Sequence, residues 1–226
     1  MPKFLLIESS GDVCSVAVSS DSDIIAEMSI QEKNSHSTYL ASFVDEVLQR
    51  SSFKVSDLDA VVIGGGPGSY TGLRIGCSLA KGLCFGADIP LIACSTLQAI
   101  AVSALEISPD LEQVITLIDA RRMDAYVAVY DAKLMVVKNE HFATLDSQLV
   151  VDYINGHTGL AGSGAAKWIE EFDADLVVCF TESALYARNL LPEASKKWLS
   201  KSFEDVAYYE PNYIKSVFVT KPKPKF

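Results

Sequence analysis

Three short apolar runs open the chain, and polar, turn-rich residues separate them. The runs cover residues 3–10, 13–20 and 23–30 and contain many β-branched side chains. Runs of this length and composition are typical of β-strands. The separators, residues 10–12 and 20–23, are short enough for hairpin turns. The pattern therefore predicts three consecutive antiparallel strands.

The spacing of the apolar positions then changes. Apolar residues recur every three or four positions within residues 37–50, which predicts an amphipathic helix. The pattern next predicts a buried strand over 59–65, a helix over 73–85, a strand over 89–94 and a helix over 95–105. This order, βββαβαβα, is that of the first lobe of the actin-like, sugar-kinase-like ATPase fold, although other α/β domains share parts of it.

The second half of the chain repeats this theme with fewer elements. The expected elements are strands over 114–119, 125–131, 133–142 and 174–180, a helix that contains Trp168 and Ile169, and short helices within 183–203. Residues 106–112 interrupt the pattern and indicate a boundary between lobes. We therefore expect an α/β protein with a two-lobed actin-like ATPase (ASKHA, ribonuclease H-like) fold and a reduced second lobe. Its parts are an N-terminal lobe (1–108), a C-terminal lobe (109–215) and a flexible basic tail (216–226).

The composition is that of a folded protein without a membrane span. Hydrophobic residues make up 49% of the 226 residues, which is enough to bury a core. No apolar run approaches the roughly 18 residues that a membrane helix needs. The first residues run directly into a strand pattern without a signal-peptide cleavage site, and the five cysteines form no CxxC pair. These features indicate a cytoplasmic protein with reduced thiols.

The charge is acidic overall and unevenly distributed. The formal net charge is -10, yet residues 196–226 carry seven lysines and three acidic residues. The rest of the chain carries 12 basic and 26 acidic side chains. Such an acidic body repels the phosphates of a nucleic acid. We therefore expect the chain to meet nucleic acid only through a partner.

The densest glycine run, GGGPGSYTGLRIG, covers residues 64–76 between a predicted strand and a predicted helix. A Walker loop would need a lysine after its last glycine, and a dinucleotide-binding turn would need the spacing GxGxxG; the run has neither. A geometric role remains, in which the strand end passes close to other backbone, turns sharply and enters a capped helix. The residues assigned to this role are Gly66, Pro67, Gly68, Ser69 and Gly72.

The helix predicted over 73–85 is apolar or small nearly all round. We therefore favour a partner-binding surface made by this helix and the helix over 37–50; the alternative is that both only cover their own sheet. Arg74 lies near the helix start, the unfavourable end for a cation, which predicts an acidic side chain or bound anion beside it. An Ala80→Glu substitution is expected to block partner binding and leave the fold intact. The surface is assigned to His36, Tyr39, Leu40, Phe43, Val47, Arg74, Gly76, Leu79, Ala80 and Leu83.

The run GPGSYTGLRIG closely resembles the signature of the bacterial TsaB (YeaZ) family. Further family landmarks follow in the same order along nearly the whole chain. They are IESS (7–10), CSVAV (14–18), HS (36–37), IDARRMDAY (118–126), AGSG (161–164) and PNYIK (211–215). Three departures are mild and put single contacts in doubt: Glu8 stands for aspartate, Asp124 for glutamate, and Lys215 for arginine, which loses the guanidinium fork.

The resemblance implies a non-catalytic subunit that pairs with its paralogue TsaD and with the ATPase TsaE. Together these proteins transfer a threonylcarbamoyl group from threonylcarbamoyl-AMP to the adenosine 3′ of the anticodon in tRNAs reading codons that begin with A. The family's partner contact is made by the same two helices. The resemblance thus implies a heterodimer with TsaD, contact with tRNA only through the complex, and no membrane. Without TsaD we expect a homodimer through the same surface.

The residues themselves offer little chemistry. The three histidines, His36, His141 and His157, do not form the pair four residues apart that a helical metal site needs, so we expect neither metal nor catalytic residues. Two short turns resemble nucleotide-binding loops, although we favour ordinary strand-end turns. We expect no tightly bound cofactor in this chain and expect ATP to bind at an interface of the complex. The candidates for these loops are Glu8, Ser9, Ser10, Gly162 and Gly164. The alternative functions are an independent actin-like ATPase or small-molecule kinase and, after these, a glycoprotease-like peptidase.

Overall fold

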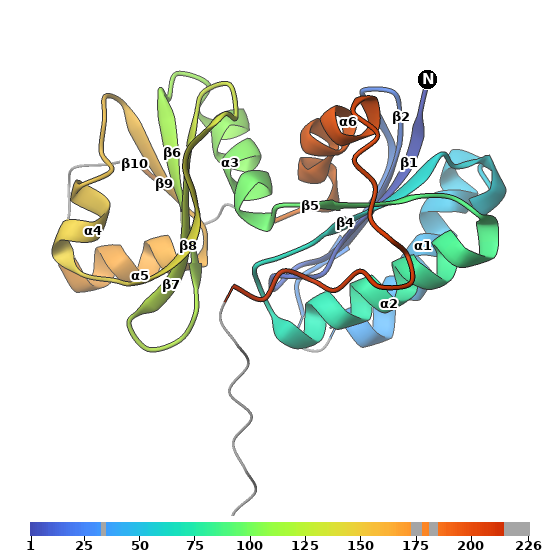
Figure 1. Ribbon diagram of the computed structural model, residues 1–226, viewed down its shortest axis with the longest axis horizontal. Helices are drawn as coiled ribbons and strands as arrows, with labels where there is room; N and C mark the ends of the chain where they lie inside the picture. Colours follow the sequence, from blue (N-terminus) through green and yellow to red (C-terminus); the bar gives the residue numbers. More distant parts are fainter. Residues whose placement is uncertain (33–34, 173–177, 181–184, 215–226) are drawn as a thin grey trace, which may run out of the picture.

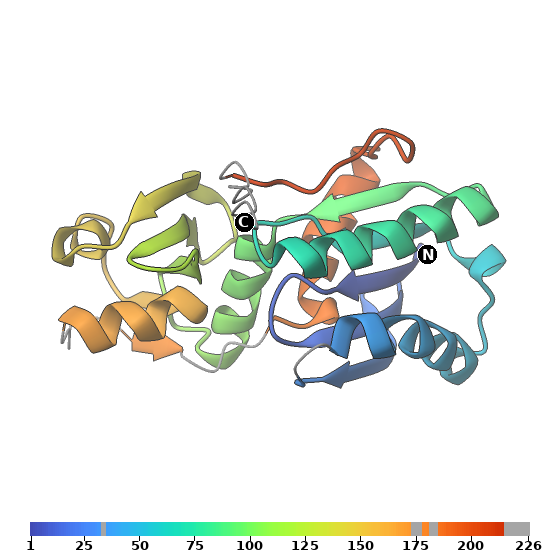
Figure 2. The ribbon, with the colours of Figure 1, turned by 90° about the horizontal axis from the view of Figure 1, so that it is seen from below.

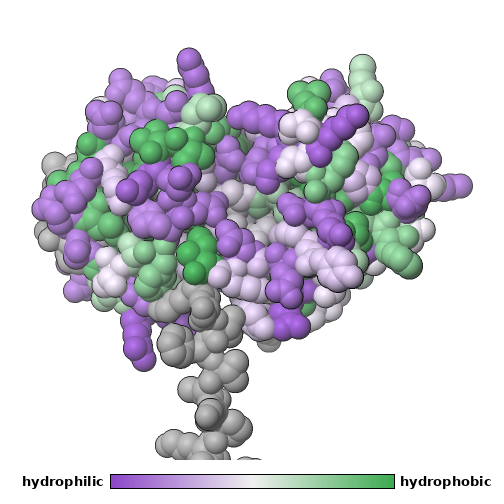
Figure 3. Space-filling model, in the orientation of Figure 1, coloured by the Kyte–Doolittle hydropathy of each residue, from purple (hydrophilic) through white to green (hydrophobic). Residues whose placement is uncertain are grey.

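The computed structural model describes residues 1–32, 35–172, 178–180 and 185–214. Two five-stranded sheets lie side by side, each with helices against it (Figure 1). Hydrophilic side chains cover most of the face seen in Figure 3, and hydrophobic ones are scattered over both lobes. The predicted tail over 216–226 lies outside the described residues.

The first sheet has the strand order β3-β2-β1-β4-β5. Its strands are β1 (Lys3–Glu8), β2 (Cys14–Ser20), β3 (Asp23–Ile30), β4 (Ala60–Gly64) and β5 (Leu91–Cys94). β1, β2 and β3 are antiparallel neighbours, whereas β4 runs parallel to β1 and to β5. The three opening strands predicted from the apolar runs are thus confirmed.

Helices cover both faces of this sheet. α1 (Ser35–Ser51) and α2 (Tyr70–Ala87) lie next to each other on one face (Figure 2), and the short 3-10 helix η1 (Val55–Asp57) precedes β4. Alternate residues of β1 serve the two faces: Leu5 and Ile7 pack beneath α1 and α2, while Phe4 and Leu6 pack against the opposite layer. Burial on both faces explains why β1 and β4 read as continuous apolar runs.

The second sheet repeats the topology of the first. Its order is β10-β9-β6-β7-β8, so its first strand is again central and its next two strands again form an antiparallel edge. Its strands are β6 (Gln113–Asp119), β7 (Asp124–Asp131), β8 (Val136–Thr144), β9 (Thr158–Ala161) and β10 (Val178–Phe180). The helices α4 (Ser147–Val151) and α5 (Ser163–Phe172) accompany it, and the buried Trp168 of α5 joins its core.

Helix α3 (Thr96–Ile107) lies between the two sheets (Figure 2). Its buried residues share one core with Phe4 and Leu6 of the first sheet and with Val114 and Ala128 of the second. The predicted break at residues 106–112 coincides with the connection from α3 to β6. The helix therefore contributes to a core that both sheets share.

The last part of the described chain returns to the first sheet. The 3-10 helix η2 (Ala187–Leu190) packs against β1, β2 and β4, and α6 (Leu191–Leu199) lies beside β5. The ring of Trp198 in α6 lies 5.6 Å from that of Phe4. Residues 204–213, which we call the strap, then run from α6 along α2 toward the second lobe (Figure 1). The predicted second lobe (109–215) includes η2 and α6, whose apolar side chains share a core with Phe4 and Leu6 of the first sheet, and this division into lobes stays a prediction.

Some element boundaries differ from the sequence prediction. α2 begins at Tyr70, three residues before the predicted start, because the Ser69 side chain accepts a hydrogen bond from the Gly72 amide. β8 begins at Val136 because Asp131 Oδ1 accepts the amides of Lys133 and Met135 and holds a turn. Of the strand predicted over 174–180, Val178–Phe180 is observed and 174–177 lies outside the described residues.

Candidate functional site

The glycine turn between β4 and α2 lies directly against the turn that follows β1. The Ser69 amide donates to the Ser10 carbonyl (2.7 Å), and Ser9 Oγ donates to the Gly72 carbonyl (2.9 Å). A Cβ atom at Gly68 would lie 2.6 Å from the Ser10 carbonyl oxygen, and one at Gly72 would overlap with that of Ser9. Glycine at these positions therefore lets α2 approach residues 8–10 closely.

The rest of the glycine turn is also bound to the protein. The Gly65 amide donates to the Cys94 carbonyl (2.7 Å), and Thr96 Oγ1 donates to the Pro67 carbonyl. Gly66 has a φ of 108°, which favours glycine, and a Cβ atom there would lie 2.7 Å from the Asn212 carbonyl oxygen. The turn thus joins β5, α3 and the strap.

Residues 8–10, the first nucleotide-loop candidates, face the interior. Glu8 is fully buried, and Ser9 and Ser10 are nearly so. Glu8 Oε1 accepts the Ser10 amide (2.5 Å), while Oε2 has no hydrogen-bond partner among the described residues. Burial raises the pKa of Glu8 to about 7, although hydrogen bonds from Ser10 and Ser9 lower it. The Ser9 hydroxyl is thus bound to the first turn of α2, and the Glu8 carboxyl is enclosed beside the Ser10 amide and Gly64 rather than open to solvent.

The second pair of nucleotide-loop candidates is built in the same way. Gly162, with a φ of 100°, lies against the Leu117 carbonyl oxygen of β6. A Cβ atom at Gly164 would lie 2.9 Å from the Leu117 Cβ atom, and Ser163 Oγ accepts the Asp119 amide (3.0 Å). In each lobe, glycines at the start of a helix thus permit close approach to the central strand.

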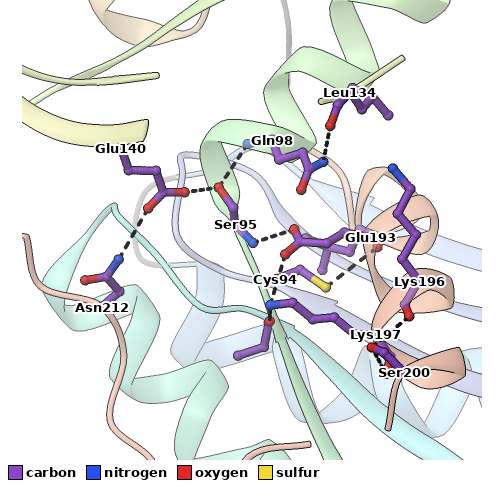
Figure 4. A network of polar contacts seen from close by, with 12 residues as sticks. Cys94, Ser95, Gln98, Leu134, Glu140, Glu193, Lys196, Lys197, Ser200 and Asn212 are labelled. Carbon is purple, nitrogen blue, oxygen red and sulfur yellow. Dashed lines mark hydrogen bonds and ion pairs between the residues drawn. The ribbon is translucent and has the colours of Figure 1, made fainter. Parts of the chain in front are cut away.

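A polar network links the two lobes beside the glycine turn (Figure 4). Its centre is Ser95, whose Oγ accepts the Gln98 amide (3.0 Å) as the N-cap of α3 and donates to Glu140 Oε1 of β8. The Ser95 amide donates to Glu193 Oε2 of α6 (2.8 Å). Asn212 Nδ2 of the strap reaches Glu140 Oε2 (3.3 Å). Strand β8 of the second lobe is therefore tied to the first lobe and to the strap.

Two carboxylates share this network. Lys197 Nζ lies 3.0 Å from Glu193 Oε1 and donates to the Ala93 carbonyl, which leaves Glu140 without a cation in direct contact among the described residues. Burial raises the pKa of Glu140, and the negative charge of Glu193 adds to the rise. The network therefore favours a protonated Glu140 more than water would.

The predicted partner surface on α1 and α2 divides into an inner and an outer half. Five of its residues are buried in the core of their own lobe and cannot reach a partner: Leu40, Phe43, Val47, Gly76 and Ala80. They repeat at the spacing that faces the sheet, and the small residues on α2 let that helix lie close to β1; a Cβ atom at Gly76 would overlap with Ser9 Oγ. The structure gives these five residues a packing role within the chain, and their assignment to a partner surface stays a prediction. The other five are exposed or half-buried: His36, Tyr39, Arg74, Leu79 and Leu83.

The outer face of α2 also carries residues that the sequence reasoning missed. Tyr70 is 42% exposed and Phe85 86% exposed, and Ile75 is half-buried between them. Phe85 could have been predicted to be exposed, because it lies on the side of the helix away from the buried positions. No acidic side chain in the described part of the chain forms an ion pair with Arg74, whose Nη1 atom donates to the Tyr70 hydroxyl (2.5 Å).

The strap closes one side of this face. Lys81 Nζ of α2 donates to the carbonyls of Ala207 (3.0 Å) and Tyr209 (3.1 Å). Farther along, the Asn212 amide donates to the Gly65 carbonyl (2.8 Å). The strap has no periodic apolar pattern, and no signal in the sequence placed it here.

The histidines lie apart. His141 Nε2 lies 3.3 Å from the Tyr153 hydroxyl, and His157 Nδ1 lies 3.3 Å from Asp110 Oδ2, whereas His36 lies at the start of α1. No three His, Cys, Asp or Glu side chains in the described part of the chain could hold a metal together.

Comparison with known proteins identifies the family. The sequence model of the family described as "TsaD: tRNA N6-adenosine threonylcarbamoyltransferase" matches residues 23–217. The tRNA threonylcarbamoyladenosine biosynthesis protein TsaB of Escherichia coli (strain K12) is 29% identical over 229 residues, which cover 98% of each chain. The chain belongs to the TsaB (YeaZ) family, within the larger group that the TsaD sequence model describes. The resemblance seen in the glycine run is thus confirmed.

Solved structures confirm the fold of this TsaB family member. YeaZ from Pseudomonas aeruginosa superposes with a TM-score of 0.84 at 24% identity, covering 94% of this chain and 100% of that one. The activator of the 2-hydroxyisocaproyl-CoA dehydratase from Clostridium difficile, solved with bound ADPNP, gives a TM-score of 0.50 at 11% identity, covering 90% of this chain and 98% of that one. The predicted two-lobed actin-like fold is therefore correct. No helix among the described residues has the length and apolar character to cross a membrane.

Proposed function

We propose that this TsaB family member is a non-catalytic subunit in tRNA threonylcarbamoyladenosine biosynthesis. In this proposal it acts with TsaD and TsaE, which transfer threonylcarbamoyl from threonylcarbamoyl-AMP to the adenosine 3′ of the anticodon in tRNAs reading codons that begin with A. The observation that carries the proposal is the similarity to Escherichia coli TsaB over 98% of both chains. Its place of action is the cytoplasm, and it reaches tRNA only through the complex.

The inward orientation of the two glycine turns supports a scaffold role. Glu8, Ser9, Gly162 and Gly164 are buried against neighbouring backbone or apolar groups. The two turns therefore hold α2 and α5 in place within the chain. This packing role supports a scaffold more than a nucleotide-binding enzyme. ATP, in this proposal, binds at an interface of the complex and not tightly to this chain.

The outer face of α1 and α2 supports binding to TsaD. Phe85 has 86% of its surface exposed, and Tyr70 and Ile75 lie on the same helix. Burying one large apolar side chain contributes roughly 1.5–3 kcal/mol, so covering Phe85 alone would strengthen binding about tenfold to a hundredfold. We infer that TsaD covers this face in the complex and that a second copy of the chain covers it when TsaD is absent.

Reconstitution with purified TsaD, TsaE and unmodified tRNA tests the proposal. We expect modification with the chain present and little without it. We also expect Phe85→Asp to lose TsaD on co-purification, while Leu199→Asp, an equally exposed position on α6 (82%), retains it. Modification that is unchanged without the chain would overturn the proposal.

An independent ATPase or kinase is the alternative to be excluded by the same preparation. Its basis is the fold shared with the ADPNP-bound activator and the buried Glu8 carboxyl, whose pKa lies near 7. Rapid ATP hydrolysis by the purified chain, abolished by Glu8→Gln, would favour this alternative. A glycoprotease-like activity would appear as hydrolysis by the chain alone.

A further inference from the structure

A cavity of about 400 Å³ lies between α2 and the strap, and we call it the strap pocket. Its lining includes Tyr70, Arg74, Cys77, Lys81, Glu210 and Tyr213. The first four residues belong to α2 and the last two to the strap. Neither the glycine turns nor the polar network between the lobes contributes to it.

The strap wall is held by contacts along its length. Glu204 pairs with Leu91 as an isolated β-bridge, the Lys81 ammonium binds two strap carbonyls, and the Asn212 amide binds the Gly65 carbonyl. The Glu204 attachment precedes the strap residues that line the pocket, and the attachments through Lys81 and Asn212 lie beside or among them. The pocket is therefore a built feature of the folded chain.

Arg74 is the charged group that the pocket presents. Its Nη1 atom donates to the Tyr70 hydroxyl, and its guanidinium lies 5.3 Å from the centre of the Tyr70 ring. The Tyr70 ring in turn lies 5.1 Å from that of Tyr213 across the pocket. Tyr70 thus orients the exposed guanidinium through its ring and its hydroxyl, and the Tyr213 ring packs on Tyr70. This orientation lowers the entropy that the guanidinium loses when it binds a ligand.

The local charge favours an acidic ligand. Arg74 and Lys81 outnumber the one acidic lining residue, Glu210, although the whole chain carries a net charge of -10. The Lys81 ammonium is occupied by strap carbonyls, whereas the Arg74 guanidinium has one hydrogen-bond partner among the described residues. A guanidinium fork matches the two oxygens of a carboxylate.

The pocket continues into the outer face of α2. Tyr70, Arg74 and Ser78 line both the strap pocket and an adjoining shallow depression that includes Thr71 and Ile75. A protein that covers Ile75 must therefore pass over the mouth of the pocket. This continuity identifies the occupant as part of the protein that docks on α2.

We propose that the strap pocket receives an aspartate or glutamate side chain of the partner protein, whose carboxylate pairs with Arg74 beside the Tyr70 and Tyr213 rings. The inference rests on the proposed function, since it assumes that a partner covers α2. It adds the chemistry that selects the partner and assigns the strap to the interface. A charge-assisted pair of this kind contributes to specificity as well as to affinity.

Titration of the intact chain with purified TsaD at two salt concentrations tests the inference. We expect Arg74→Ala to raise the dissociation constant about tenfold and to reduce its dependence on salt, and Arg74→Lys to lose less. Tyr213→Leu should weaken binding severalfold because it removes the ring that packs on Tyr70, the residue that orients the guanidinium. Lys133→Ala, which removes one positive charge from the turn before β8 in the other lobe, should bind like the wild type.

Charge reversal supplies the second measurement. Arg74→Glu should bind poorly, and a scan of exposed Asp and Glu to Lys on TsaD should find a position that restores its binding. If Arg74→Ala binds like the wild type while Phe85→Asp does not, the strap pocket inference fails and the proposed function stands. If the wild-type chain does not bind TsaD, the proposed function itself fails.

Discussion

Gly72→Ala tests the physical role of the glycine turn. Gly72 is buried in the first turn of α2, and a methyl group there would overlap with the Ser9 carbonyl oxygen and lie 3.4 Å from the Ser69 Cβ atom. The overlapping atom is backbone, not the end of a flexible side chain. Either α2 or the 8–10 turn must therefore move to admit the methyl group.

The size of the effect follows from opposing contributions. Alanine is favoured over glycine inside a helix by about 1 kcal/mol. Overpacking at a tight site costs about 1–3 kcal/mol. A shift that separates Ser9 Oγ from the Gly72 carbonyl, now 2.9 Å apart, removes a buried hydrogen bond worth about 1 kcal/mol. We therefore expect the free energy of unfolding to fall by about 2 kcal/mol.

Gly82→Ala is the matched control. Gly82 is an exposed residue of the same helix, and no atom lies within 4 Å of a Cβ placed there. Alanine at this position should raise the free energy of unfolding by about 0.5–1 kcal/mol. Urea unfolding followed by circular dichroism compares the two variants with the wild type. A Gly72→Ala protein that is stabilised as much as Gly82→Ala would refute the close-approach argument.

Two further predictions concern buried positions. Glu8→Gln should flatten the pH dependence of the free energy of unfolding. The raised pKa of Glu8 makes the wild type lose about 3 kcal/mol of stability as the pH rises from 4.5 to about 7. Urea midpoints that change equally with pH in the variant and the wild type across that range would contradict this. Ala80→Glu should unfold the protein, because Ala80 has no exposed surface and a buried, unpaired carboxylate costs several kcal/mol. If the Ala80→Glu protein is soluble and folded but does not bind TsaD, Ala80 belongs to the partner surface, as the sequence analysis predicts.

The order of strands and helices could be predicted because apolar residues recur with a different spacing in each kind of element. The three opening strands and the helix now seen as α1 agree closely with their apolar patterns. The sequence distinguishes the glycine turn from the standard phosphate loops, since the turn lacks the lysine of one and the spacing of the other, and its geometric role stays a prediction. The division of the chain into folding units stays a prediction, because α3 is shared by both sheets.

The orientation of α2 could not be predicted because its pattern is apolar or small on several sides. Gly76 and Ala80 suggested a groove for a partner helix, yet they are small because α2 lies close to β1. Tyr209 and Tyr213 line the strap pocket from a segment without regular spacing. Contacts between α2 and residues 130 positions away depend on the tertiary fold, and no local pattern encodes them.

The course of the strap decides where foreign sequence can be attached. Asn212 joins Gly65 and Glu140, so the chain leaves the described structure next to the outer surface of α2, whereas Met1 is highly exposed at another place (Figure 1). Residue 214, from which the rest of the chain and any carboxyl-terminal tag continue, lies beside the helix that TsaD is expected to cover. Fusion at the amino terminus leaves that surface free, so purification from that end is the safer choice for every binding experiment above.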